Sequence, residues 1–184
     1  MALIQTIGHS TRPVEELVAM LRAHAVQCLV DVRRFPGSRR NPQYGRAALE
    51  AALAASGIGY MPLPELGGRR DARPDSPNTH WREKGFRGYA DYMASAEFRE
   101  ALARLAQLGG ERRCAIMCAE AVPWRCHRQL IADALVAGGD DVAHITGPGP
   151  ARPHVLNPAA RVGAGGILTY PGEQGQLFEA EPGT

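Results

Sequence analysis

Short apolar segments that alternate with amphipathic segments constrain the fold of this chain most strongly. Five of them are too short for helices and predict buried strands: 3–7, 28–32, 59–61, 113–118 and 142–145. Between them, segments 46–56 and 97–108 repeat apolar residues at helical spacing. Strands that alternate with helices predict an α/β fold, a three-layer and largely parallel sheet flanked by helices.

The chain divides into three parts by composition. Residues 1–146 contain all five predicted strands and form the expected α/β catalytic domain. Residues 147–170 are richer in glycine and proline, and we expect an extension there with a hairpin packed on the domain. Residues 171–184 predict a flexible tail. Within the domain, the proline-, glycine- and arginine-rich connection 62–87 is long enough to be a binding loop or lid.

Composition excludes several classes of protein. No run of eighteen apolar residues exists among the 184, so we expect no membrane span. The first residues lack the pattern of a signal peptide, and four cysteines do not form a typical disulfide scaffold, so we expect a cytoplasmic protein. Lys84 is the only lysine among 21 basic residues. This bias reflects either a genome rich in guanine and cytosine or phosphate recognition by arginine.

Polar residues follow three of the strands at their carboxyl ends, where open α/β sheets bind ligands. After the first strand, Gly8 allows close approach of a ligand, and His9 and Ser10 precede a helix whose free N–H groups favour an anion. We expect Ser10 or Thr11 to cap that helix. The alternative is a capped helix with an incidental histidine.

The second strand ends with Asp31 and Arg33 and leads into a basic loop. An aspartate in an apolar strand needs a partner, and the neighbouring arginine is the natural one. The loop carries five arginines interleaved with aromatic and small polar residues: Arg33, Arg34, Arg39, Arg40 and Arg46 with Phe35, Ser38 and Tyr44. Because arginine binds phosphate and aromatic rings stack on bases, we interpret the loop as a phosphate or nucleic-acid surface rather than an ordinary solvated loop.

Segment 118–128 concentrates the reactive side chains, namely Cys118, Glu120, Arg125, Cys126, His127 and Arg128. Four interpretations are open. Cys118 could be a thiolate nucleophile, or Glu120 an acid or base with the cysteines only lining a pocket. The cysteines could also be buried as small apolar residues. Zinc binding by Cys118, Cys126 and His127 ranks last, because adjacent Cys and His are not a standard ligand pair, and we expect no metal.

These segments resemble the bacterial and archaeal family called domain of unknown function 488. The resemblance rests on segments 6–11, 31–33 with 36–39, 66–68, 92–93 and, above all, 118–120 with 126–128. It runs from Leu3 to about Ile145 and continues into the last residues, and it implies site positions without a settled reaction. A looser resemblance to rhodaneses rests on Asp31-Val32-Arg33 and Cys118. Glu120 and Pro123 depart from the anion cradle of those enzymes.

The tail contains Gln174, Leu177 and Phe178, spaced as in the peptides by which bacterial repair and replication enzymes dock on the sliding clamp. The alternative is that Leu177 and Phe178 pack back on the domain. If the tail docks on the clamp, the protein acts at DNA.

The sequence therefore predicts an enzyme that acts on nucleic acid, in DNA repair or base processing, with N-glycosidic cleavage of a damaged or modified base as the specific reaction. Asp31 or Glu120 would activate water or stabilise positive charge, and His9 or His127 would transfer protons, without a cofactor. We expect phosphate or substrate contacts from Gly8, Ser10, Arg33, Ser38, Arg39, Arg125 and Arg128, and base stacking by Tyr44, Trp81, Phe86 or Tyr89. Two alternatives stay open: a rhodanese-like sulfurtransferase or phosphatase that uses Cys118, and a non-catalytic nucleic-acid or nucleotide binding module.

Overall fold

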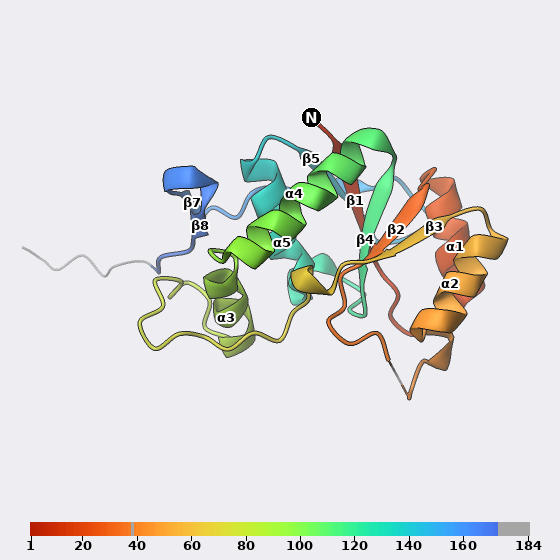
Figure 1. Ribbon diagram of the computed structural model, residues 1–184, viewed down its shortest axis with the longest axis horizontal. Coiled ribbons are helices and arrows are strands. Elements are labelled where there is room, and N and C mark those ends of the chain that lie inside the picture. Colours follow the sequence, from red (N-terminus) through yellow and green to blue (C-terminus); the bar gives the residue numbers. More distant parts are fainter. Residues whose placement is uncertain (38, 173–184) are drawn as a thin grey trace, which may run out of the picture.

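A six-stranded sheet forms the centre of the computed structural model, which describes residues 1–37 and 39–172 (Figure 1). The strand order is β3-β2-β4-β1-β5-β6, and all neighbours are parallel except β5 and β6. The strands are β1 (Leu3–Gly8), β2 (Cys28–Asp31), β3 (Gly59–Pro62), β4 (Cys114–Cys118), β5 (Asp141–Ile145) and β6 (Arg152–Pro153).

Helices cover both faces of this sheet. On one face lie α1 (Val14–Ala23) and α2 (Arg46–Ala55), and on the other lie α3 (Lys84–Tyr92), α4 (Ala96–Glu111) and α5 (Arg128–Ala137) (Figure 1). Successive strand residues alternate between the two cores, so that Leu29 packs with α1 and α2 while Val30 packs with α4 and α5. The expected three-layer α/β fold is confirmed. In the described part of the chain, no helix has the length and apolar character needed to cross a membrane.

The third helix begins earlier than the sequence suggests. We expected residues 62–87 to form a connection, but α3 already begins at Lys84, within that segment. Gly85 and Gly88 lower the helical propensity of this stretch, and tertiary packing overrides it. A side chain at Gly88 would overlap the backbone of Arg70 and Asp71, so this glycine lets the connection 62–87 cross the helix closely.

The expected cap of the first helix is wrong. Helix α1 begins at Val14, after Pro13, and no side chain accepts a hydrogen bond at this end. Ser10 instead has a φ of 50°, and its backbone N–H donates to the carbonyl of Ala119. The chain after β1 thus continues to pair with the chain after β4, and the helix starts only when that pairing ends.

A buried polar network fastens the C-terminal extension to the sheet. His144 on β5 lies 2.9 Å from His154, whose other ring nitrogen lies 2.8 Å from the carboxylate of Asp133. The Tyr170 hydroxyl donates to the second oxygen of that carboxylate, and Thr6 lies 2.7 Å from His144. The extension also contains an antiparallel pair, β7 (Arg161–Val162) and β8 (Leu168–Thr169). Four short 3-10 turns complete the elements of the described residues: Pro42–Tyr44, Pro64–Leu66, Pro123–Arg125 and Ala164–Gly166.

Acid should destabilise the protein through His144. Burial, with the charges of His154 and Arg128, lowers the pKa of His144 from 6.5 to about 4. Between these two values the unfolded chain binds a proton that the folded chain does not, so the free energy of unfolding falls as the pH falls through this window. His144→Gln stays neutral. The stability advantage of the wild type over this variant should therefore shrink by about 2 kcal/mol between about pH 7 and pH 4.5.

Urea titrations of both proteins at the two pH values measure this difference. Groups remote from His144 titrate alike in both proteins, so the comparison isolates His144 together with its contact partner His154. An advantage of the wild type that does not change with pH would contradict the prediction.

Candidate active site

One cavity of about 640 Å³ opens at the carboxyl ends of β1, β2 and β4. Its lining includes residues from all three strand ends, His9 and Ser10, Arg33, and Cys118 with Glu120. Open α/β sheets bind their ligands at this edge because the loops that follow the strands meet there. The structure thus brings together the three segments that the sequence singles out.

Asp31 and Arg33 form a buried ion pair beneath this cavity. Asp31 is 1% exposed, and its oxygens accept hydrogen bonds from Nε and Nη2 of Arg33 at 2.8 and 2.6 Å. The Tyr60 hydroxyl donates to the same carboxylate at 2.7 Å. Asp31 is not among the residues that line the cavity, whereas Arg33 is. Asp31 is therefore placed to hold Arg33 in position rather than to contact a ligand.

Gly8, His9 and Ser10 do not form the expected anion cradle. The backbone N–H groups of His9 and Ser10 donate to the carbonyls of Cys118 and Ala119, at 3.0 and 2.9 Å. A side chain at Gly8 would overlap the backbone of Glu120, so the glycine admits a neighbouring segment of this chain rather than a ligand. These interactions hold the two strand ends together at the edge of the cavity.

The His9 imidazole is buried against its neighbours. It stacks on the Tyr44 ring with 4.0 Å between centroids, and its Nδ1 lies 2.7 Å from the carbonyl oxygen of Ser10. Burial lowers the pKa of His9 to about 4, and the charge of Arg33 contributes to this shift. His9 is therefore neutral at pH 7, which suits a proton acceptor better than a donor.

Tyr44 and Arg128 are fully buried and do not line the cavity. The Tyr44 hydroxyl donates to the carbonyl of Arg12, and its ring is covered by His9, so it is not available to stack on a base. Arg128 donates to the carbonyl of Glu120 at 2.5 Å and thereby supports the loop after β4. Arg39 is exposed but outside the cavity lining. Ser38, Gln174, Leu177 and Phe178 lie outside the described residues.

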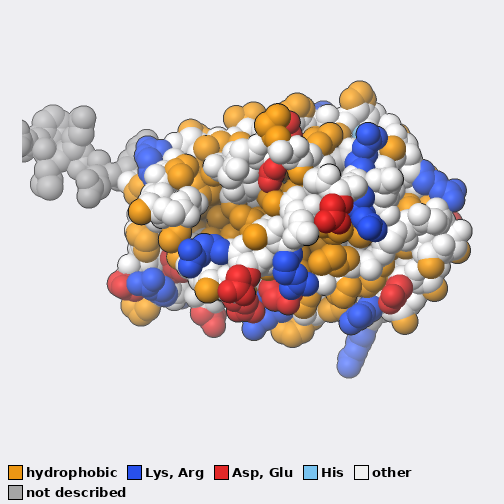
Figure 2. Space-filling view, turned by 45° about the horizontal axis from the view of Figure 1, so that its top comes forward, with side chains coloured by type: hydrophobic (Ala, Val, Ile, Leu, Met, Phe, Trp, Pro, Cys, Tyr) orange, Lys and Arg blue, Asp and Glu red, His pale blue; other side chains and the backbone are white. Residues whose placement is uncertain are grey.

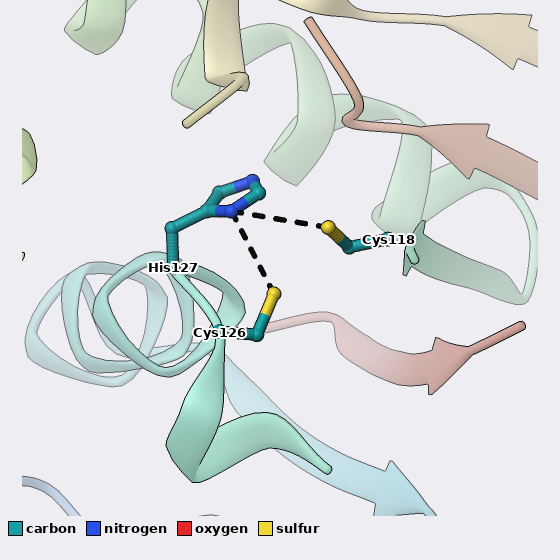
Figure 3. A group of neighbouring side chains, drawn as sticks. All are labelled: Cys118, Cys126 and His127. Carbon is teal, nitrogen blue, oxygen red and sulfur yellow. Dashed lines mark hydrogen bonds between the residues drawn. The ribbon is translucent and has the colours of Figure 1, made fainter. Parts of the chain in front are cut away.

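Cys118, Cys126 and His127 converge in the wall of the cavity (Figure 3). His127 Nδ1 lies 3.9 Å from the sulfur of Cys118 and 3.6 Å from that of Cys126. The interaction with Cys126 and burial raise the pKa of the Cys118 thiol well above its usual value. Burial alone would raise the pKa of Cys126 too, but its interactions with Cys118, His127 and Arg128 hold it well below the usual range. The Cys126 sulfur also lies within hydrogen-bonding distance of the backbone N–H and Nε of Arg128, at 3.5 and 3.4 Å, so Cys126 is better placed than Cys118 to be a thiolate.

The open side of the cavity combines cations, a carboxylate and aromatic rings. Glu120 and Arg125 are exposed, and Phe35 is 63% exposed with the Arg34 guanidinium 5.4 Å from its ring centroid. The connection 62–87 adds Arg69 and Phe86. Of the aromatic residues expected to stack, Phe86 and Tyr89 line the cavity, whereas Trp81 packs on Tyr170.

Sequence reasoning did not identify Arg69 as a site residue. It has a φ of 60°, and Ser10, another lining residue, has a φ of 50°. Residues other than glycine rarely adopt this left-handed backbone region, and such strain is common at functional sites.

Basic and acidic side chains are interspersed on the face that Figure 2 shows, so no patch of one sign dominates it.

The family described as Domain of unknown function DUF488 matches residues 13–135. The chain belongs to this family. The DUF488 match includes Asp31, Arg33 and the whole segment 118–128, and it leaves Gly8, His9 and Ser10 outside. No curated protein and no solved structure matches the chain.

Removal of the Asp31 charge should destabilise the protein strongly. Asp31→Asn leaves Arg33, which is 7% exposed, without its counter-charge, and the free energy of unfolding should fall by about 3 to 5 kcal/mol. Asp75→Asn is the matched control, because Asp75 pairs with Arg73 at the exposed surface and should leave stability unchanged. Urea denaturation measures both. Equal, small effects would mean that Asp31 does not anchor Arg33.

Proposed function

We propose that this cavity is the active site of an enzyme that processes or repairs bases in nucleic acid. The specific reaction that we propose is hydrolysis of the N-glycosidic bond of a damaged or modified base. The observation that carries the proposal is the grouping, in one cavity, of the Glu120 carboxylate with arginines and aromatic rings. We infer a cytoplasmic location from the four cysteines, which are all free.

Phosphate recognition rests on the lining arginines. Arg34, Arg69 and Arg125 line the cavity, and Arg33 lies in its wall with its charge already balanced by Asp31. The guanidinium groups at the surface match phosphate oxygens in geometry and charge. The net charge of the chain is only +2, so we expect few phosphate contacts and no broad electrostatic attraction along a duplex.

Base recognition rests on the rings and on the volume of the cavity. Phe35 and Phe86 line it, and Phe35 is largely exposed, so its ring is free to stack on a base. A base must leave the helical stack before chemistry on it is possible, and about 640 Å³ is ample for one extruded nucleotide. Exposed Arg39, outside the cavity, would contact a flanking phosphate.

Glu120 is the carboxylate that we assign to the reaction. Both candidate acids lie at the carboxyl end of a strand, but Asp31 is enclosed by Arg33 and Tyr60, whereas Glu120 is exposed and lines the cavity. In the proposed step the bond between the sugar C1′ and the base nitrogen breaks, and the base leaves with the electron pair. Glu120 stabilises the positive charge on the sugar and takes a proton from the attacking water, whose hydroxyl joins C1′. The departing base gains a proton, so the products are a free base and an abasic site.

Glu120→Gln should lower the rate of base release at least about 100-fold, because it removes the charge that stabilises the sugar cation and accepts the proton. The assay incubates the protein with single-stranded and duplex oligonucleotides that carry defined base lesions, and it detects abasic sites by alkaline cleavage. Glu100→Gln, on the exposed side of α4, is the matched control and should retain full activity.

Three results would decide against the proposal. Absence of base release from every lesion in the panel contradicts the reaction, and full activity of Glu120→Gln contradicts the role of this carboxylate. Binding of the oligonucleotides without any product favours a non-catalytic binding module.

A second candidate function is thiol chemistry, and the surroundings of Cys126 favour it. Its sulfur lies 3.6 Å from His127 Nδ1 and within hydrogen-bonding distance of the backbone N–H and Nε of Arg128, and its interactions with Cys118, His127 and Arg128 lower the pKa of its thiol. A phosphatase-like anion cradle needs free backbone N–H groups, but those of Arg125 and Cys126 donate to the carbonyls of Val122 and Pro123. Rhodaneses need the same cradle, so the form of this chemistry that we propose is sulfur transfer without that cradle, with Cys126 rather than Cys118 as the nucleophile.

Sulfur transfer predicts a persulfide on Cys126. On incubation of the protein with thiosulfate, the Cys126 thiolate would form a bond to the outer sulfur of thiosulfate while the sulfur–sulfur bond of thiosulfate breaks and sulfite leaves with the electron pair. After this incubation, mass spectrometry should detect one added sulfur atom on the peptide that contains Cys126. Cys126→Ser should abolish this adduct, whereas Cys28→Ser should retain it because Cys28 lies at the other end of the sheet. An unmodified wild-type protein contradicts sulfur transfer.

A further inference from the structure

The spacing of Cys118, Cys126 and His127 is that of a metal site. Their two sulfur atoms and the His127 Nδ1 all lie within 4.8 Å of one another. A tetrahedral zinc ion at its usual bond lengths holds a sulfur and a nitrogen ligand about 3.6 Å apart. The observed sulfur–nitrogen distances are 3.9 and 3.6 Å, so a zinc ion fits between these atoms with only small side-chain shifts.

The side chains of the adjacent residues Cys126 and His127 can bind one ion because the backbone changes direction between them. Cys126 is extended, with φ −140° and ψ 150°, whereas His127 is helical, with φ −58° and ψ −14°. Cys118 arrives from the end of β4, and Figure 3 shows the three side chains directed toward one another. The objection from sequence spacing, that neighbouring Cys and His are not a standard ligand pair, therefore does not apply to this turn.

The hydrogen bonds of His127 select the tautomer that binds metal. Its Nε2 lies 3.2 Å from the carbonyl oxygen of Val32, which only accepts, so Nε2 carries the proton. Nδ1 then presents its lone pair to two sulfur atoms at once. One thiol proton can satisfy this lone pair from only one side, whereas a cation between the three atoms satisfies all of them.

Arg128 supplies the surroundings that a thiolate ligand needs. Its backbone N–H and its Nε both lie within hydrogen-bonding distance of the Cys126 sulfur, at 3.5 and 3.4 Å. Arg128 is fully buried and forms no ion pair with a carboxylate among residues 1–37 and 39–172. A buried guanidinium requires a negative partner, and a metal-bound Cys126 thiolate provides one.

We propose that Cys118, Cys126 and His127 bind one zinc ion whose fourth coordination position faces the cavity. Three protein ligands with an open fourth position are the mark of a catalytic rather than a structural zinc site. All three residues line the cavity, so a water molecule on the ion would lie next to a bound substrate. Glu120, two residues after Cys118 and in the same lining, is available to accept a proton from this water. The proposal stands on the ligand geometry and does not depend on the substrate proposed above.

Metal analysis of the purified wild-type protein tests the site directly. We expect about one zinc per chain by elemental mass spectrometry, and removal of the zinc by a chelator followed by titration with Co²⁺ should give the visible bands of tetrahedral cobalt with a sulfur-to-metal charge-transfer band. These measurements use the wild type and are independent of whether variants fold.

Variants then assign the ligands. Cys118→Ser, Cys126→Ser and His127→Gln should each lower zinc affinity at least about 10-fold, and Cys28→Ser and Cys114→Ser should retain it. Cys28 and Cys114 are the matched controls because they form a second buried pair on β2 and β4, four residues from the cavity along β4. Circular dichroism verifies that each variant is folded.

Two outcomes overturn the proposal. In one, the wild-type protein contains no zinc and gives no tetrahedral cobalt spectrum on titration. In the other, thiol counting and mass spectrometry find Cys118 and Cys126 joined in a disulfide in freshly purified protein. Both outcomes are read without any assay of base release, so failure of the zinc site and failure of the proposed function are distinguishable.

Discussion

The contact between the end of β1 and the loop after β4 determines where His9, Cys118 and Glu120 lie in the site. Gly8 has no side chain, and this allows the backbone of Glu120 to cross it closely. The N–H groups of His9 and Ser10 continue the pairing onto the carbonyls of Cys118 and Ala119, and Arg128 holds the carbonyl of Glu120 from below. Because the loop is fixed on two sides, Cys118 and Glu120 both line one cavity. Arg128, the first residue of α5, contacts Glu120 there.

Two buried arginines lie beneath this cavity in different electrostatic surroundings. Arg33 is neutralised by the bidentate contact with Asp31, so it acts mainly as a rigid part of the wall. Arg128 has backbone and sulfur partners, and its Nη1 has no hydrogen-bond partner among the described residues. The positive charge that remains uncompensated is therefore the one beside Cys126. This charge adds to the interactions of Cys126 with Cys118 and His127, which together favour the thiolate at Cys126.

The pattern of the sequence was sufficient to predict the sheet and the edge of the sheet at which the candidate site lies. Apolar segments with β periodicity and polar residues at their carboxyl ends are local signals, and the parallel arrangement follows from the helices between them. The roles of single residues could not be predicted in this way, because they depend on contacts with residues distant in the sequence. Asp31 is two residues from its partner, but only the position of Tyr60 on β3 shows that the carboxylate is enclosed. Tyr44 is unavailable to a base because His9, which follows β1 and is distant in the sequence, covers its ring.

The two pairs of cysteines have different surroundings in this fold, although both pairs are buried. Cys28 and Cys114 lie side by side at the beginnings of β2 and β4, within the apolar core. Cys118 ends β4 and meets Cys126 at the opposite edge, and both are also largely buried. Burial therefore does not separate the pairs. The second pair differs because the His127 lone pair and the Arg128 guanidinium lie against it, and both groups require a polar partner that apolar packing cannot supply. This pair also lines the open cavity. The chemistry of the site is thus encoded in the groups around the sulfur atoms rather than in the cysteines themselves.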